Sequence, residues 1–184
     1  MLSANSAAFL GATKMGLVYL WTGDGAGKST SAFGTALRAV GHEKKVVIIQ
    51  FLKGRKDIGE YKVAEKLKPN YEIHQFGRPE LIDLKNPTDE DEELAQSGVK
   101  FAREIMYHKR PFLLILDEIN LVVSIGLLKA EDVISLIDKA PEETTIYLTG
   151  RNAPKELIDR ADVVNEIKSV KYPKEIKALE GIQY

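Results

Sequence analysis

The sequence contains no cysteine among its 184 residues, which excludes disulfides, thiolate metal sites and thiol catalysis. No apolar run approaches the roughly 20 residues of a membrane-spanning helix. A dominant charge is also lacking, because 26 lysines and arginines face 27 aspartates and glutamates. This balance gives no global attraction to nucleic acid or to an anionic membrane, so we expect neither as a partner.

The first fifteen residues differ from the rest of the chain. The segment MLSANSAAFLGATK lacks the basic amino-terminal region of a secretory signal. Together with the missing cysteines, this predicts a cytoplasmic location. Residues 1–15 are predicted to be a poorly ordered extension before a start at Met15, or a short apolar helix that docks on the domain or on a neighbouring subunit. Residues 16–184 are predicted to form a single domain with one core.

Short apolar runs alternate with segments of helical periodicity, and this order is typical of an α/β fold with a parallel sheet and crossover helices. Strands are predicted at Gly16–Thr22, Lys45–Phe51, Tyr71–Gln75, Phe112–Asp117, Thr144–Thr149 and Val163–Ile167. Helices are predicted at Lys28–Val40, Gly59–Leu67, Asp89–Tyr107, Ala130–Lys139 and Pro154–Arg160. Four of the strands are almost continuously apolar, which indicates a sheet covered on both faces. The segment Phe76–Thr88 is predicted to be a long loop, and such loops often act as lids.

A glycine-rich turn lies between the first strand and the first helix. It consists of Thr22, Gly23, Asp24, Gly25, Ala26, Gly27, Lys28, Ser29 and Thr30. This arrangement is typical of a P-loop, in which backbone N–H groups and a helix amino terminus converge on a phosphate. Lys28 is predicted to reach the phosphates and Ser29 to hold magnesium. Thr22 stands where the strict pattern has its first glycine, and Asp24 either assists a metal or points to solvent.

The run PFLLILDEIN predicts a buried strand that ends in two carboxylates, Asp117 and Glu118. Because the carboxyl ends of parallel strands share one edge of a sheet, both would face the phosphate loop. Asp117 is predicted to hold magnesium through water, and Glu118 to bind the metal or to orient a nucleophile or a sugar hydroxyl. The two motifs together predict a P-loop NTPase fold of the RecA-like type. Its central sheet would be mostly parallel, with about six strands and helices on both faces.

Polar residues also follow two other predicted strands. Gln50 and Lys53 lie at the end of the second strand and are candidates for contacting the nucleotide. Arg151 follows the fifth strand, where it would neutralise the charge of a triphosphate or would be an ordinary surface arginine. The histidines are scattered without metal-ligand spacing, so we assign them no chemistry.

From Gly16 to Tyr184 the chain resembles the P-loop family of ATP:corrinoid adenosyltransferases. The resemblance is carried, in this order, by TGDGAGKSTSAFGTALRAVGH (22–42), VVIIQFLKG (46–54), LILDEIN (114–120), LTGRNAPKELIDRADVVNEI (148–167) and GIQY (181–184). It implies a reaction in adenosylcobalamin biosynthesis or salvage, in which a Co(I) corrinoid attacks the ribose C5′ of ATP and triphosphate leaves. The resemblance also implies that ATP lies reversed on the loop compared with ordinary P-loop enzymes.

The resemblance implies roles for particular residues. The phosphate loop would bind phosphates and metal, Glu118 magnesium or ribose, and Arg151 phosphate, so that Lys28, Glu118 and Arg151 are the expected catalytic residues. It further implies a corrinoid substrate, a flavin-dependent or other cobalt reductase as partner, and a homodimer. Many members have Asn and Lys where this chain has Asp24 and Ala26, which makes this loop more negative.

A corrin ring needs an apolar surface that excludes water from the cobalt. Our candidates for this surface are Phe51, Phe76 and Leu81.

Two other functions fit the phosphate loop. A kinase or ATPase would use Glu118 to position a hydroxyl or water for attack on the γ-phosphate, and it would release ADP instead of triphosphate. A nucleotide-dependent switch would bind ATP tightly without turnover, with the Phe76–Thr88 loop as its moving part.

Overall fold

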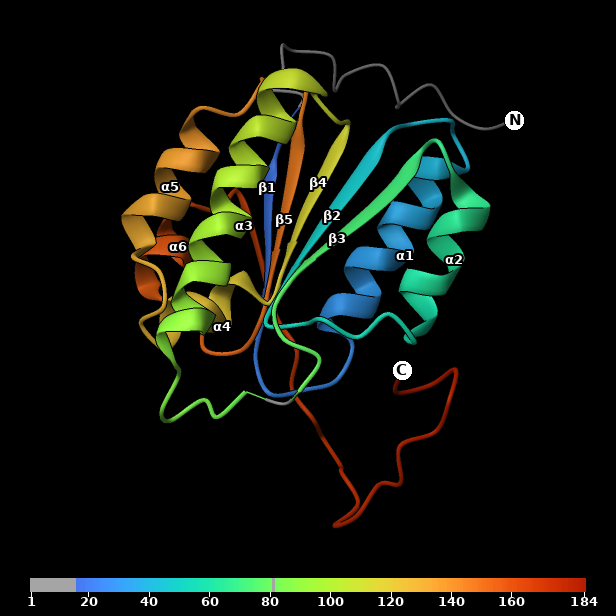
Figure 1. Cartoon of the computed structure of the whole chain (residues 1–184), viewed down its shortest axis with the longest axis vertical. Coiled ribbons are helices and arrows are strands. Elements are labelled where there is room, and N and C mark those ends of the chain that lie inside the picture. The colour runs from blue at the N-terminus through green and yellow to red at the C-terminus, as the bar shows by residue number, and fades with distance from the viewer. Residues whose placement is uncertain (1–15, 81) are drawn as a thin grey trace, which may run out of the picture.

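The computed structural model describes residues 16–80 and 82–184, and its centre is one sheet of six strands (Figure 1). The strands are β1 (Val18–Thr22), β2 (Val46–Phe51), β3 (Tyr71–Phe76), β4 (Leu113–Asp117), β5 (Thr145–Thr149) and β6 (Val163–Glu166). Their order is β3-β2-β4-β5-β1-β6, and every neighbouring pair is parallel. The predicted α/β class and parallel sheet are confirmed.

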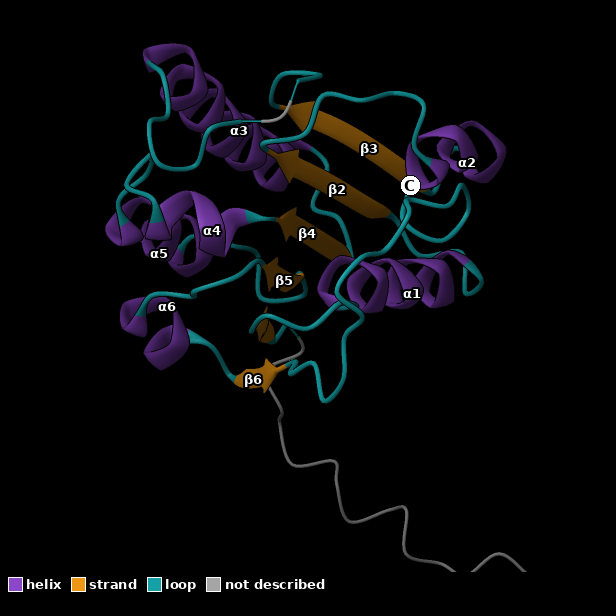
Figure 2. Cartoon of the chain, turned by 90° about the horizontal axis from the view of Figure 1, so that it is seen from below, coloured by secondary structure: helices purple, strands orange, loops and turns teal. Residues whose placement is uncertain are grey.

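Helices cover both faces of this sheet, as predicted (Figure 2). They are α1 (Lys28–Val40), α2 (Gly59–Leu67), α3 (Asp89–His108), α4 (Ile119–Ser124), α5 (Ala130–Asp138) and α6 (Lys155–Arg160). Helices α1 and α2 lie on one face, and the other four lie on the opposite face. Strand β2 shows why its sequence is continuously apolar: Val47 and Ile49 join the core beneath α3, whereas Val46 and Ile48 join the core beneath α1.

Small residues bring α1 close to the sheet. Ala32, Ala36 and Ala39 recur at helical spacing and are all buried. A narrow alanine face lets the helix axis approach the strands, and it fixes the amino terminus of α1 at the carboxyl edge of the sheet, directly after the phosphate loop. Lys28, the first residue of α1, is placed in this way.

Helix α3 begins with an acidic first turn, and carboxylates there favour the positive end of the helix dipole. Thr88 and Asp91 form a reciprocal capping box, and the Arg78 guanidinium donates to both Asp91 carboxylate oxygens at 2.9 and 3.0 Å. Burial opposes ionisation of Asp91, but the hydrogen bonds from Thr88 and Arg78 hold its pKa below the usual value. Arg78, near the start of the loop between β3 and α3, is therefore joined to the first turn of α3.

Several boundaries differ from the prediction. Strand β1 begins at Val18 and not at Gly16, β3 includes Phe76, and Pro154 caps α6 from outside its first turn. Helix α4 was not predicted, because its sequence INLVVS continues the apolar run of β4. The prediction for residues 1–15 lies outside the described part of the chain. Among residues 16–80 and 82–184, no helix has the length and apolar character needed to cross a membrane.

Candidate active site

The ends of β1, β4 and β5 surround one cavity of about 670 Å³ at the carboxyl edge of the sheet. Its walls are formed by Asp24, Gly25, Ala26, Gly27, Lys28, Ser29, Thr30, Glu118, Arg151, Ser169, Tyr172 and Gln183. The structure thus brings the predicted phosphate loop, one predicted carboxylate and the predicted arginine together. A cavity of this volume is in the usual range for sites that bind small molecules and cofactors.

The phosphate loop curls around the lysine that begins α1. The Lys28 ammonium donates to the carbonyl oxygens of Gly23 and Gly25, both at 2.7 Å, and burial lowers the pKa of Lys28. The loop is also braced against the strand end of β6, because the Gly25 N–H donates to the Ile167 carbonyl at 2.8 Å. A Cβ on Gly23 would lie 2.4 Å from that carbonyl oxygen, so only glycine permits this approach.

Thr22 lies at the end of β1 and is not among the described residues that line the cavity. Its hydroxyl oxygen accepts a hydrogen bond from the Ala153 N–H at 3.1 Å. A threonine at the position of the first P-loop glycine therefore connects β1 to the loop that carries Arg151. This contact gives the departure from the strict pattern a structural role.

Asp117 is completely buried at the end of β4 and is surrounded by donors. It accepts from the Lys53 ammonium at 2.6 Å, from the Thr149 hydroxyl at 2.7 Å and from the Gln50 amide at 3.2 Å. Burial opposes ionisation, but Lys53, with help from the Ser29 and Thr149 hydroxyls, lowers the pKa of Asp117. Asp117 therefore joins the phosphate loop to strands β2 and β5 as a carboxylate.

Glu118 follows at the turn into α4, in the left-handed region with φ 66°. Its N–H donates to the Thr149 hydroxyl at 3.0 Å, which holds this unusual conformation in place. Burial raises the pKa of Glu118 and the neighbouring Asp117 adds to the effect, although Lys53, Lys28 and Arg151 oppose it. A carboxylate with a raised pKa, facing cations in a cavity, is typical of a functional site.

Asn120 is a residue of this site that the sequence analysis did not single out. It is fully buried, and its amide donates to the carbonyl oxygens of Trp21 at 3.1 Å and Gly150 at 3.4 Å. Asn120 therefore joins the ends of β1 and β5 and positions Arg151, the residue after Gly150. The signal that could have found it is a polar side chain within the apolar run of α4.

Two predicted contacts with the ligand are wrong. Phe51 is fully buried beneath α3, where a Cβ on Gly98 would lie only 2.6 Å from its ring, so Phe51 belongs to the core and not to a corrin surface. Gln50 is also fully buried, and its amide is used by Asp117, Glu60 and Gln75.

Two other residues that were predicted to contact a ligand, Phe76 and Lys53, are partly exposed. Phe76 is half-buried and packs against Phe101, with ring centroids 5.4 Å apart. Lys53 is partly exposed beside Asp117 and lies 4.0 Å from Glu118. Leu81 is not among the described residues.

Three lining residues come from the segment after β6. Ser169, Tyr172 and Gln183 line the cavity together with the phosphate loop. Their sequence shows no periodicity and no strand or helix signal, so their place could not be inferred from local pattern.

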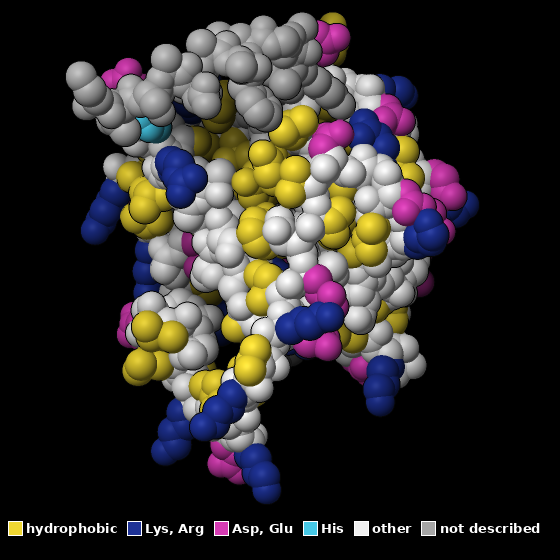
Figure 3. All heavy atoms as spheres, turned by 180° about the vertical axis from the view of Figure 1, so that it is seen from behind, with side chains coloured by type: hydrophobic (Ala, Val, Ile, Leu, Met, Phe, Trp, Pro, Cys, Tyr) yellow, Lys and Arg dark blue, Asp and Glu magenta, His cyan; other side chains and the backbone are white. Residues whose placement is uncertain are grey.

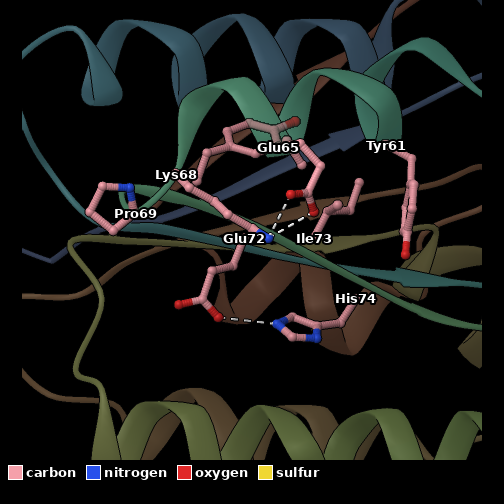
Figure 4. A pocket seen from close by; sticks show the side chains of 9 residues that line it. Tyr61, Glu65, Lys68, Pro69, Glu72, Ile73 and His74 are labelled. Carbon is pink, nitrogen blue, oxygen red and sulfur yellow. Dashed lines mark hydrogen bonds and ion pairs between the residues drawn. The ribbon is translucent and has the colours of Figure 1, made fainter.

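A second cavity, of about 470 Å³, lies between α2 and the edge strand β3 (Figure 4). Its charged side chains are paired with one another: Lys68 donates to Glu65, and His74 pairs with Glu72. The predicted phosphate loop, Glu118 and Arg151 line the first cavity, so we assign the chemistry there.

Oxygen donors are available in the active site for a magnesium ion. The described residues contain no group of three or more His, Asp or Glu side chains arranged to hold a metal. Magnesium, however, keeps several waters and is usually bound through one or two side chains together with substrate phosphates. The Ser29 hydroxyl and the Glu118 carboxylate, both at the cavity, fit this requirement.

Glu118→Gln should stabilise the protein at neutral pH while lowering its activity. Because burial raises the pKa of Glu118, its ionised form costs folding free energy above the usual pKa of 4.5, and this cost disappears below it. We expect the midpoint of thermal unfolding to rise by about 2–4 °C at pH 7–8, and the gain to vanish as the pH falls toward 4.5. Glu104→Gln, on the exposed face of α3, is the matched control and should show no such gain. An equal or lower midpoint for Glu118→Gln at pH 7–8 would contradict the argument.

Comparison with known proteins agrees with this geometry. Residues 14–184 match the family model described as ATP:corrinoid adenosyltransferase BtuR/CobO/CobP. A corrinoid adenosyltransferase of Escherichia coli strain K12 is 33% identical over 178 residues, which cover 92% of this chain and 86% of that protein. Corrinoid adenosyltransferase CobA of Salmonella typhimurium is 33% identical over 172 residues, with the same coverage. A corrinoid adenosyltransferase of Pseudomonas aeruginosa is 31% identical over 171 residues, covering 92% and 84%. The matched region contains the whole cavity, and the chain belongs to the ATP:corrinoid adenosyltransferase family.

Proposed function

We propose that this enzyme transfers the 5′-deoxyadenosyl group of ATP to the Co(I) centre of a corrinoid and releases inorganic triphosphate. Family membership and the names of its relatives support ATP and a corrinoid as the substrates. The observation that carries the residue assignments is the convergence of the phosphate loop, Lys28 and Arg151 on one cavity.

The chemistry fits this convergence of positive groups. The electron pair of Co(I) forms the bond from cobalt to C5′, the bond from C5′ to the ester oxygen breaks, and that oxygen leaves with its electrons on triphosphate. Cobalt is thereby oxidised to Co(III), and no proton has to be removed. The barrier depends on stabilising the negative charge of the leaving group, which preorganised cations and N–H groups do well.

The residues have separate roles in this proposal. Lys28 and Arg151 neutralise the phosphates, and the N–H groups from Ala26 to Ser29 position them. Ser29 and Glu118 would hold magnesium, whose chemistry when bound is to neutralise phosphate oxygens. Asp117 is best placed to orient Ser29 and Lys53, since its own oxygens are already occupied by donors within the protein.

The corrin side of the site is supported by fewer contacts. Phe76 at the end of β3 and the described parts of the loop that follows it, residues 77–80 and 82–88, lie at the same edge of the sheet as the phosphate loop and are our candidates for covering the corrin (Figure 1). A cobalt reductase and a homodimer belong to the proposal as well, on the strength of the resemblance alone.

The direct test is anaerobic incubation of the protein with ATP, magnesium and chemically reduced cobalamin. We expect the corrinoid spectrum to change to that of adenosylcobalamin, with inorganic triphosphate formed in equal amount. Formation of ADP and phosphate with an unchanged corrinoid would overturn the proposal in favour of a kinase or ATPase. Tight ATP binding without any product would instead indicate a nucleotide-dependent switch.

A further inference from the structure

The last part of the chain, residues 168–184, runs across the carboxyl edge of the sheet without forming a helix or strand. It follows β6 directly, and Figure 1 shows it in red, looping out below the phosphate loop and returning toward α2. It contributes Ser169, Tyr172 and Gln183 to the wall of the nucleotide cavity. We call this segment the strap.

The strap is held at both ends. At its start, Lys168 pairs with Glu166 at the end of β6, at 2.9 Å. At its far end, the Arg55 guanidinium lies 5.2 Å from the centre of the Tyr184 ring, and a further ion pair joins Glu180 to α2. Exposed ion pairs and cation–π contacts of this kind are each worth about 1 kcal/mol or less, so the strap can detach and reattach at low cost.

The charge of the strap is opposite to that of the chain as a whole. It contains four lysines and two glutamates, so its side chains carry 4 − 2 = +2, whereas the whole chain carries −1. The lysines are Lys168, Lys171, Lys174 and Lys177. Figure 3 shows dark blue side chains on this projecting segment at the bottom of the molecule. A basic segment beside a phosphate loop is complementary to a polyanion.

The side chains that the strap directs at the cavity suit the same ligand. Tyr172 offers a hydroxyl donor and Gln183 an amide donor, and they line the cavity together with Lys28 and Arg151. Phosphate oxygens are hydrogen-bond acceptors, and donors facing them from a second wall would complete their coordination.

We propose that the strap closes over bound ATP and contacts its triphosphate through Tyr172 and Gln183. This inference rests on the proposed function, because it requires ATP in the cavity. Closure excludes water from the triphosphate during transfer, and opening releases the triphosphate product. The strap thus forms a second half of the phosphate site, although it lies far from the phosphate loop in the sequence.

Binding measurements test the contacts. In calorimetric titrations with magnesium present, Tyr172→Ala and Gln183→Ala should each raise the Kd for ATP, and for inorganic triphosphate alone, about threefold to tenfold. Val170→Ala is the matched control, because Val170 lies on the same segment, is fully exposed and does not line the cavity. Unchanged Kd values in the double variant Tyr172→Ala/Gln183→Ala would overturn the inference.

Mild trypsin digestion tests the closure. Trypsin cleaves after lysine, and Lys171, Lys174 and Lys177 lie on the strap, so removal of the carboxyl-terminal peptide reports its opening. In the wild-type protein, magnesium ATP should slow this cleavage at least about fivefold relative to cleavage elsewhere in the chain. Equal rates with and without ATP, in protein shown by calorimetry to bind ATP, would overturn the inference while the proposed function stands. Wild-type protein that binds no ATP would overturn both.

Discussion

Lys28→Ala should weaken ATP binding and lower turnover, each by at least about 100-fold, while the fold is retained. The Lys28 ammonium is buried inside the phosphate loop, 2.7 Å from two loop carbonyls, so a phosphate that enters the loop meets a positive charge that needs no further ordering. Alanine removes the cation that lies inside the loop and leaves its N–H groups, Arg151 and magnesium to neutralise a triphosphate. Calorimetric titration with magnesium ATP and the anaerobic corrinoid assay would measure the two losses.

The control for this variant is Arg38→Ala, near the other end of the same helix. Arg38 is exposed, and its removal takes the same positive charge from α1 without touching the loop. Both variants should keep a cooperative thermal unfolding transition. If Lys28→Ala bound ATP as tightly as the wild-type protein does, our assignment of the phosphate loop would be wrong.

The phosphate loop was predictable because its parts are consecutive in the chain. Residues 22–30 contain the turn, the lysine and the hydroxyl, and the strand and helix on either side fix how they are presented. The strands were predictable for a related reason: β2 is buried on both faces, so every residue of it is apolar except Gln50.

The rest of the site depends on which strands are neighbours, and a single sequence does not state this. Strand β5 lies between β1 and β4, so Thr149 becomes the partner of both Asp117 and Glu118. Phe51 shows the same limit. Its position at the end of β2 suggested contact with a ligand, but the absence of a side chain at Gly98 makes room for its ring in the core.

The pairing of Asp117 with Lys53 should be worth a large part of the protein's stability. Asp117→Ala is expected to lower the free energy of unfolding by about 3 kcal/mol, the lower end of the range for breaking a buried ion pair, because Lys53 is partly exposed and can still reach water. The Thr149 hydroxyl and the Gln50 amide would also lose their acceptor. Chemical denaturation at pH 7 would measure the loss.

The double variant Asp117→Asn/Lys53→Met separates the interaction energy of the ion pair from the other contacts that Asp117 makes. Removing both charges should recover at least about 1 kcal/mol relative to the sum of the losses in the single variants Asp117→Asn and Lys53→Met, because neither charge is then left without its partner. If the losses in free energy of unfolding were simply additive, the interaction between Asp117 and Lys53 would contribute nothing to stability.

The pH dependence of the Asp117 effect has a definite sign. Lys53 lowers the pKa of Asp117, so the stability it contributes is present above the usual value of 3.8 and is lost as the pH falls below it. Asp117 and Lys53 also reinforce each other, because Asp117 raises the pKa of Lys53 against the effect of burial. The difference in stability between the wild-type protein and Asp117→Ala should therefore stay level from pH 5 to pH 9 and shrink only in stronger acid. A difference that already declined between pH 7 and pH 5 would mean that Asp117 is protonated near neutrality, and that its carboxylate could not orient the phosphate loop in the way we propose.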